Sequence, residues 1–269
     1  MTDNPNKTQY LAYIGKQLPI ATAFFKQYET ETSWSAEKQA MHSVTISGSK
    51  IGAIVGDCKY RTPLDVFLDM TLQKAPFGGN YKTRRGQAME HEIAYEASEV
   101  LHGKLGGGLT LSHPEKPYFT CQIDETIKTS TLGAFPCECK WIGFPTADWG
   151  KGSNIDAAGN IISEDSQIPR DYYDQVMWQL GLMKACYGDK APAFAILAAI
   201  IKNEPAPRIY VIHFANGLSL GCHGTQAGRW KQPDLPASAR HPVPAPCPVQ
   251  ALAPVFILLA SPPADLGDV

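Results

Sequence analysis

The stretch from Pro117 to Lys140 constrains this chain most, because it sets acidic residues and a lysine on two apolar runs. Asp124 ends the first run, and Glu138-Cys139-Lys140 follows after thirteen intervening residues. Residues two apart on a strand share a face, so Glu138 and Lys140 should point the same way and Cys139 the other way. Two carboxylates and a lysine on two strands joined by a polar turn can hold a magnesium ion beside a phosphate.

The cysteines on either side of Glu138 allow two interpretations. Cys137 and Cys139 could be metal thiolates, but they face away from the carboxylate, and no second close cysteine pair completes a four-ligand site. We therefore expect them to be buried, apolar-like thiols.

Composition limits the protein classes to consider. The chain has 269 residues, 44% of them hydrophobic, which suffices for one sizeable core with appendages. A net charge of −2 gives no overall basic field, although a local basic patch can still face phosphates. Seven cysteines, an odd number, and a polar N-terminus without a secretory signal favour a reducing, cytoplasmic setting. The longest apolar runs are shorter than the roughly 20 residues of a membrane span, so we expect no membrane association.

Helical and strand patterns alternate along the chain, which favours an α/β (α+β) class. Helices are expected at Trp34–His42, from about Lys50, at Leu64–Lys74, at Gly86–Leu101 and at Arg170–Cys186. Strands are expected from Ser43, at Leu109–Ser112, Tyr118–Ile123 and Ala134–Trp141, and as an antiparallel pair at Ala191–Ile201 and Pro207–Phe214. The segments 126–130 and 143–166 are interpreted as a polar turn and a long mobile loop. Residues 1–33 are mixed, since Pro19 interrupts a weak helical period.

Small residues and hydroxyls precede the helix that begins near Lys50. Free backbone N–H groups and the helix dipole favour a phosphate beside Ser47-Gly48-Ser49. An ordinary N-cap serine is the simpler interpretation of the same pattern. Two basic stretches follow, the turn with Lys59 and Arg61 and the dense run Lys82-Thr-Arg-Arg85. These cations can contact a DNA backbone, or they can be solvated surface charges.

The helix at Gly86–Leu101 carries glutamates at both borders of its buried stripe. Met89, Ile93, Ala97 and Val100 recur at helical spacing and define that stripe. Glu90 and Glu96 border opposite edges, so periodicity alone does not choose between them as a metal ligand.

The chain changes character near Asn216. Residues 231–269 hold nine of the 21 prolines and keep no helical period. We divide the chain into an N-terminal extension (1–33), a core domain (34–215) and a Pro-rich, poorly ordered tail (216–269). The tail's composition resembles out-of-frame sequence, which comparison of the coding DNA with an intact relative would test.

Five pieces of the chain occur in an order typical of one family. They are Ile46-Ser-Gly-Ser49 with Ile51-Gly-Ala-Ile-Val-Gly56, Gly86-x-x-x-Glu90, Tyr118 to Asp124, Glu138-x-Lys140, and Tyr172-Tyr-Asp-Gln-Val-Met-Trp-Gln179. Together they resemble the phage lambda exonuclease and YqaJ-type viral recombinase family, of the PD-(D/E)xK nuclease superfamily, over roughly residues 34–214. The resemblance implies a restriction-endonuclease-like core, a central mixed β-sheet flanked by helices.

The resemblance also implies roles for single residues. Glu90, Asp124 and Glu138, with the backbone carbonyl of Cys139, would bind Mg²⁺, for which Mn²⁺ is a candidate substitute. Lys140 would orient or activate the attacking water, and Gln175 would support the site from its helix. The resemblance, and not periodicity, prefers Glu90 to Glu96.

End recognition is where the chain departs from the family. Ser49 would contact a DNA phosphate near the 5′ end, but the family's arginine seven residues earlier is His42 here. Lys38 or Lys50 are candidate substitutes for that charge. The remaining DNA contacts expected are Lys59, Arg61, Arg84 and Arg85. The Pro-rich tail also replaces the final helix of the family. Whether this chain forms a ring-shaped trimer is therefore an open question.

The function expected is a Mg²⁺-dependent 5′-to-3′ exonuclease acting on linear double-stranded DNA ends in phage-type recombination. A single-strand annealing protein is the expected partner, and the cytoplasm of a bacterial host is the expected location. An endonuclease of the same superfamily and a non-catalytic DNA-binding protein are the alternatives. An iron–sulfur nuclease is disfavoured, because Cys222 and Cys247 are too sparse for a terminal cluster.

Overall fold

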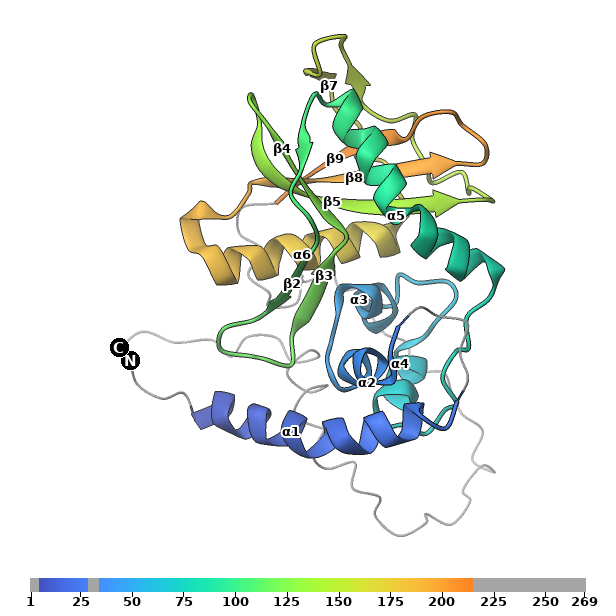
Figure 1. Ribbon diagram of the computed structural model, residues 1–269, viewed down its shortest axis with the longest axis vertical. Helices are drawn as coiled ribbons and strands as arrows, with labels where there is room; N and C mark the ends of the chain where they lie inside the picture. Colours follow the sequence, from blue (N-terminus) through green and yellow to red (C-terminus); the bar gives the residue numbers. More distant parts are fainter. Residues whose placement is uncertain (1–4, 29–33, 215–269) are drawn as a thin grey trace, which may run out of the picture. The chain divides into compact units, whose positions relative to one another are not determined.

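The computed structural model describes residues 5–28 and 34–214 (Figure 1), and its centre is a five-stranded mixed sheet in the order β1-β4-β5-β8-β9. The strands are β1 (Lys104–Leu105), β4 (Glu125–Thr129), β5 (Gly133–Ile142), β8 (Phe194–Ile201) and β9 (Arg208–His213). The long strand β5 pairs antiparallel with β4 and parallel with β8, while β8 and β9 are antiparallel. The central mixed sheet and the mixed α/β class expected from the sequence are thereby confirmed.

Two long helices cover the two faces of this sheet. Strand β8 is apolar almost throughout, as expected for a strand buried on both sides. Its residues Ile196 and Ala198 join the core under α5 (Tyr81–Val100). The alternate residues Ala195, Leu197 and Ala199 join the core under α6 (Arg170–Tyr187). Alternation along β5 and β8 therefore assigns each side chain to one helix or the other.

Four N-terminal helices precede the sheet: α1 (Pro5–Phe25), α2 (Ala36–Val44), α3 (Gly48–Val55) and α4 (Pro63–Met70). Ala21 of α1 packs with Ala40 and Val44 of α2 in a small separate core. Helix α3 packs closely on α6, where a Cβ at Gly52 would lie 2.8 Å from the Cβ of Asp171. Only glycine permits that approach without a shift of one helix.

Two short hairpins and a single 3₁₀ turn, at Gly188–Lys190, complete the described part. β2 (Leu109–Ser112) pairs with β3 (Thr120–Ile123), and β6 (Asn154–Ile155) pairs with β7 (Ile161–Ser163). The Trp178 indole N–H on α6 donates to the Thr120 carbonyl at 2.9 Å, which ties β3 to the helix.

Most of the expected elements are confirmed, and four expectations are wrong. Helix α1 runs through Pro19, and α2 extends to Val44, so the chain from Ser43 forms only an isolated bridge at Ile46 rather than a strand. The polar stretch 126–130 belongs largely to strand β4, because its register with β5 is set by the apolar Ile127 on the buried face. The expected loop at 143–166 contains the β6–β7 hairpin.

The described residues, 5–28 and 34–214, belong to one compact unit. The predicted Pro-rich tail, 216–269, lies outside the described residues. Among the residues that are described, no helix is both long and apolar enough to cross a membrane.

Candidate functional site

Glu138 is the most enclosed charged group of the site, with only 1% of its surface exposed. The Lys140 ammonium and the Gln175 amide both donate to its Oε1, the amide at 2.5 Å. The Gln179 amide donates to its Oε2 at 2.6 Å. Glu138 and Lys140 thus share one face of β5, as their spacing predicted. A buried carboxylate is tolerable only when hydrogen bonds and an opposite charge compensate it, and α6 supplies both amides.

Lys140 keeps its charge in this enclosed position. Burial alone would lower the pKa of its ammonium, but Glu138 and Asp124 together hold that pKa above its usual value. The ammonium also lies 5.4 Å from the ring centre of Tyr172, which the start of α6 contributes. A cation is therefore fixed beside the carboxylates at any working pH.

Asp124 lies at the bend between β3 and β4, opposite Glu138. The β4–β5 register pairs Glu125 with Cys137, so the preceding position reaches the level of Glu138. The backbone N–H of Cys139 donates to Asp124 Oδ2 at 2.9 Å. Burial, then the charge of Glu138, raises the pKa of Asp124, and Lys140 opposes the rise.

Glu90 lies on α5, the helix that covers the face of the sheet opposite Glu138. Its carboxyl group is half-buried, and its pKa is raised first by burial and also by Glu138, while Lys140 lowers it. Glu90, Asp124 and Glu138 therefore influence one another electrostatically.

The donor chemistry of this set fits a hard divalent cation. Glu138 raises the pKa of both Glu90 and Asp124, so a positive ion would stabilise their charged forms, and carboxylate oxygens are the ligands that Mg²⁺ prefers. In the described part of the chain, no three His, Cys, Asp or Glu side chains stand ready-arranged as a metal cluster. Glu138 is occupied by Lys140 and the two glutamines, so binding of an ion would require it to exchange some of these contacts.

A second polar group lies where α2 meets α3. His42 Nε2 is 2.9 Å from Ser47 Oγ and 3.0 Å from Ser49 Oγ, and the two hydroxyls are 3.2 Å apart. Burial lowers the pKa of His42 to about 3, and Lys50, Arg61 and Lys38 contribute. The imidazole is consequently neutral. Ser47 occupies the N-cap of α3 without making a side-chain cap bond, so its hydroxyl serves the histidine instead.

The expectation that Lys50 contacts a DNA phosphate is wrong. Its side chain is 1% exposed, and its ammonium donates to the carbonyl oxygens of Ser43 at 3.2 Å and Thr45 at 2.8 Å, besides that of His42. Burial, followed by the charge of Arg61, lowers its pKa to about 7. Lys50 closes the end of α2 and does not face solvent.

The other predicted cations lie at the surface, several of them paired. Lys59 lies 3.8 Å from Asp148, and Arg61 pairs with Asp69. Arg85 donates to the Tyr81 hydroxyl at 2.8 Å. Arg84 is exposed on the first turns of α5. They remain candidates for backbone contacts.

The cysteines on either side of Glu138 behave as expected. Cys137 and Cys139 are buried in the core under α5, with their sulfur atoms 4.0 Å apart. Both are free thiols on the face of β5 opposite Glu138.

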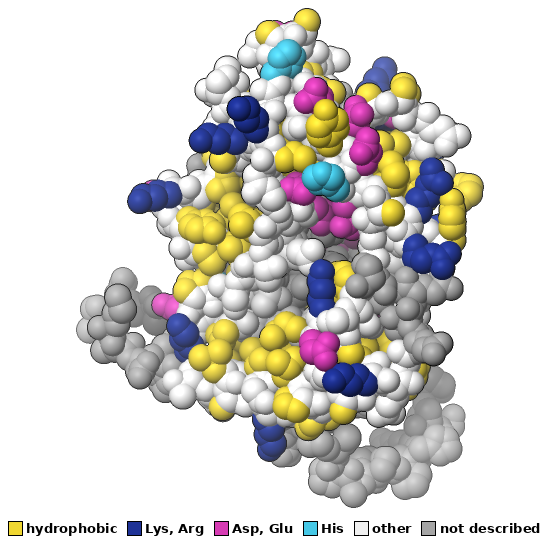
Figure 2. Space-filling view, in the orientation of Figure 1, with side chains coloured by type: hydrophobic (Ala, Val, Ile, Leu, Met, Phe, Trp, Pro, Cys, Tyr) yellow, Lys and Arg dark blue, Asp and Glu magenta, His cyan; other side chains and the backbone are white. Residues whose placement is uncertain are grey.

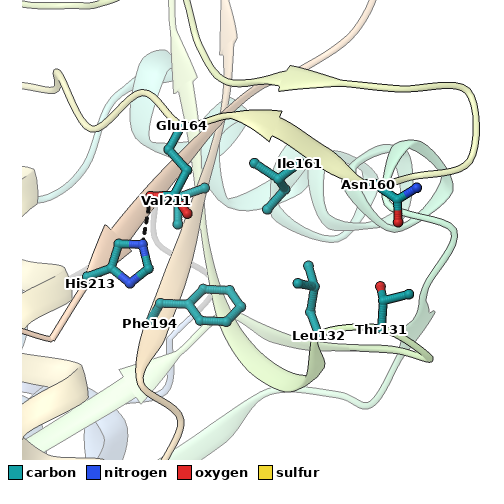
Figure 3. Close-up of a pocket in the computed structure, with 8 residues that line it drawn as sticks. All are labelled: Thr131, Leu132, Asn160, Ile161, Glu164, Phe194, Val211 and His213. Carbon is teal, nitrogen blue, oxygen red and sulfur yellow. Dashed lines mark hydrogen bonds and ion pairs between the residues drawn. The ribbon is translucent and has the colours of Figure 1, made fainter.

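A separate cavity of about 360 Å³ opens beside the β6–β7 hairpin (Figure 3). Phe194 and Leu132 form its apolar part, and His213 Nε2 lies 2.7 Å from Glu164 Oε2 at its edge. None of the predicted site residues lines it, so the carboxylate set and this cavity are distinct features.

Comparison with known families places the chain. Residues 37–184, more than half of the chain, match the model of the YqaJ-like viral recombinase domain. The chain belongs to this family. A search of curated proteins finds no match.

Solved structures similar to this YqaJ-like chain include an alkaline exonuclease from Laribacter hongkongensis. It is 13% identical, with a TM-score of 0.43, over 65% of this chain and 79% of that one. The same exonuclease in complex with dAMP gives 12% identity and a TM-score of 0.42, over 65% and 80%. The structure of SSO0001 gives 12% identity and a TM-score of 0.33, over 75% and 77%.

The YqaJ-like domain also contains one site residue to which the sequence assigned no role. Gln179 is 1% exposed, and its amide donates both to Glu138 and to the Gln122 carbonyl at 3.0 Å. It therefore joins α6 to β5 and to the strand that leads into Asp124. The signal was its position four residues after Gln175, on the same helical stripe.

Proposed function

We propose that this chain is a Mg²⁺-dependent deoxyribonuclease, and specifically a 5′-to-3′ exonuclease that acts on linear double-stranded DNA ends during phage-type recombination. The observation that carries the proposal is the buried Glu138–Lys140 pair, held by two glutamines of α6 beside Asp124. A Glu-x-Lys pair without a catalytic role would not require two buried amide donors. A catalytic centre does, because its reacting groups must be held in a fixed geometry.

Asp124, Glu138 and Glu90, with the carbonyl of Cys139, would hold the ion, and Mn²⁺ would be accepted in place of Mg²⁺. The metal supplies polarisation of the phosphoryl group and a more acidic bound water. Gln175 would keep one Glu138 oxygen in position while the other contacts change.

Lys140 would orient the attacking water and stabilise the negative charge that develops on the phosphate. Its raised pKa keeps the ammonium charged across the working range. Asp124 and Glu90 have raised pKa values, so acid would protonate them and weaken metal binding.

DNA ends would be held by the group at the start of α3. Ser49 is exposed there, and Ser47 and the neutral His42 offer hydrogen bonds rather than a fixed charge. Lys59, Arg61, Arg84 and Arg85 would hold the duplex backbone without reading bases, so binding would depend strongly on salt. The proposal also includes a single-strand annealing protein as the partner and a homotrimer as the assembly. The proposed location is the cytoplasm of a bacterial host.

The decisive experiment compares three DNA substrates with Mg²⁺ present and withheld. They are a linear duplex with 5′-phosphates, the same duplex with 5′-hydroxyls and a closed circle, each also tested with the Lys140→Ala variant. We expect metal-dependent loss of the linear substrates and none with Lys140→Ala. Binding of DNA without hydrolysis would overturn the enzymatic proposal, and cutting of the circle would replace the exonuclease by an endonuclease.

A further inference from the structure

Two cation–aromatic pairs join the start of α5 to the chain at the end of β5. The Lys82 ammonium lies 4.7 Å from the ring centre of Phe144, and the Arg85 guanidinium lies 4.8 Å from that of Trp141. Figure 1 shows these two ends side by side, and Figure 2 shows basic and apolar side chains gathered at the same edge. The pairs form one continuous surface on two elements.

The aromatic rings of this surface are unusually open. Phe144 is 81% exposed and Tyr81 is 59% exposed. Trp141 is better covered, since a Cβ at Gly143 would lie 3.2 Å from its ring. The Phe144 ring therefore adds little to the core, and the Lys82 ammonium lies against it.

Open rings interleaved with cations suit one kind of occupant. Lys82, Arg84 and Arg85 are exposed here and match a phosphate backbone in charge. A duplex keeps its bases stacked inside and offers a free base face only at its ends, whereas an unpaired strand can stack successive bases on aromatic side chains. The rings therefore favour single-stranded over double-stranded DNA at this surface.

We propose that Tyr81, Phe144, Lys82 and Arg85 form a stacking platform for an unpaired DNA strand beside the carboxylate site. This deepens the proposed function and rests on it, because removal of one strand of a duplex leaves the other unpaired. Arg85 precedes Glu90 by five residues, about 7 Å along the helix. Phe144 follows Lys140 by four residues, at most about 14 Å of chain. At about 3.4 Å per nucleotide, these separations between the platform and the carboxylate site correspond to roughly two to four nucleotides of one strand.

The test measures binding separately from hydrolysis. A fluorescein-labelled dT12 strand and a blunt 12-base-pair duplex are titrated with the full chain in EDTA, and anisotropy is recorded at several salt concentrations. The variants are Phe144→Ala, Phe144→Leu and Lys82→Ala. Tyr95→Ala is the matched control, because Tyr95 is also exposed, on the same helix.

We expect Phe144→Ala to weaken dT12 binding by at least about fivefold, with no change for the blunt duplex. Phe144→Leu should lose nearly as much, because it keeps an apolar side chain but has no aromatic face. Lys82→Ala should lower the salt slope by about 0.7, whereas Phe144→Ala should leave the slope unchanged. Tyr95→Ala should bind as the unaltered chain does, and thermal midpoints check that every variant is folded.

Equal dT12 affinity of Phe144→Ala and the unaltered chain would overturn the platform, even if linear duplex is hydrolysed when Mg²⁺ is added. Dependence of dT12 binding on Phe144 without any hydrolysis would instead support the platform and overturn the proposed nuclease. An equal loss of affinity for the blunt duplex would also count against an unpaired strand as the occupant.

Discussion

Two regions were expected to act on a phosphate, and they differ in how their side chains are held. At β5 and α6, Glu138 is enclosed by Lys140 and two glutamines, and Asp124 is held nearby by the Cys139 N–H. At the junction of α2 and α3, His42 and Ser49 meet, but Lys50 turns inward. In a strand, side chains alternate between the two faces, so the spacing of two residues gives their directions. In the first turn of a helix, the direction of a side chain depends on how the surrounding elements pack.

The difference is also one of charge. The β5–α6 region combines buried carboxylates with a lysine whose pKa is raised. The α2–α3 region offers a neutral histidine and hydroxyls, with its nearest lysine engaged by backbone carbonyls. The β5–α6 region is suited to binding a cation and to hydrolysis. The α2–α3 region is suited to hydrogen bonding with a DNA end. Four predictions test this division, from the largest expected effect to the smallest.

Replacement of the central carboxylate should have the largest effect. Glu138→Gln keeps the shape but removes the charge, and places an amide among the donors of Lys140, Gln175 and Gln179. We expect hydrolysis of linear duplex to fall at least about a hundredfold, measured as release of acid-soluble nucleotides. Ser49→Ala is the matched change in the other region and should alter only the preference between 5′-phosphate and 5′-hydroxyl ends. If Glu138→Gln and Ser49→Ala lost similar amounts of hydrolytic activity, the two regions would not have the separate roles proposed for them.

Replacement of Gln179 should change the Mg²⁺ concentration that activity requires. Gln179→Met keeps the length but leaves Glu138 Oε2 and the Gln122 carbonyl without its amide. The Mg²⁺ concentration for half-maximal activity should rise about 10- to 100-fold, with most of the rate recovered at saturating metal. Gln167→Met, at an exposed glutamine, should leave the requirement unchanged. An unaltered Mg²⁺ requirement in Gln179→Met would assign this residue to packing alone.

Much of the carboxylate site could be predicted because its residues lie on regular elements. The two-residue period of a strand predicted that Glu138 and Lys140 point the same way. The helical period of α6 predicted that Gln175 and Gln179 lie on one stripe. The orientation of Lys50 could not be predicted, because it depends on where α2 ends, and α2 continues through Ser43 into Val44. The strand at 126–130 was missed because its exposed face is polar, and only pairing with β5 orders it. The parallel pairing of β5 with β8 likewise joins segments far apart in the chain.

The two regions meet through α3 and α6, so a change at their contact should affect both. In Gly52→Ala the new Cβ would lie 2.8 Å from Asp171 Cβ and 2.9 Å from its Cα, which forces the helices apart. We expect a loss of about 1–3 kcal/mol in the free energy of unfolding, measured by urea denaturation. Gly86→Ala is the control: nothing lies within 4 Å of its Cβ, so this variant should be slightly stabilised. Equal stability of the two variants would mean that α3 and α6 do not constrain one another.

The smallest effect expected is a change in how stability depends on pH. Burial, followed by Arg61, lowers the pKa of Lys50 from 10.5 to about 7. Between these two values the unfolded chain binds a proton that the folded chain does not, so this lysine makes stability rise as pH rises through the window. Lys50→Met removes that contribution, and we expect its thermal midpoint to fall behind that of the unaltered chain by several degrees more at pH 9.5 than at pH 7.

The control for this prediction is Lys82→Met, because Lys82 is exposed at the start of α5. Its thermal midpoint should follow the pH dependence of the unaltered chain, while its binding of DNA should become less sensitive to salt. Lys50→Met should show the reverse pattern, with altered pH dependence and an unaltered salt slope. If Lys50→Met instead lowered the salt slope and left the pH dependence intact, its ammonium would face the DNA. The α2–α3 region would then carry a fixed positive charge after all.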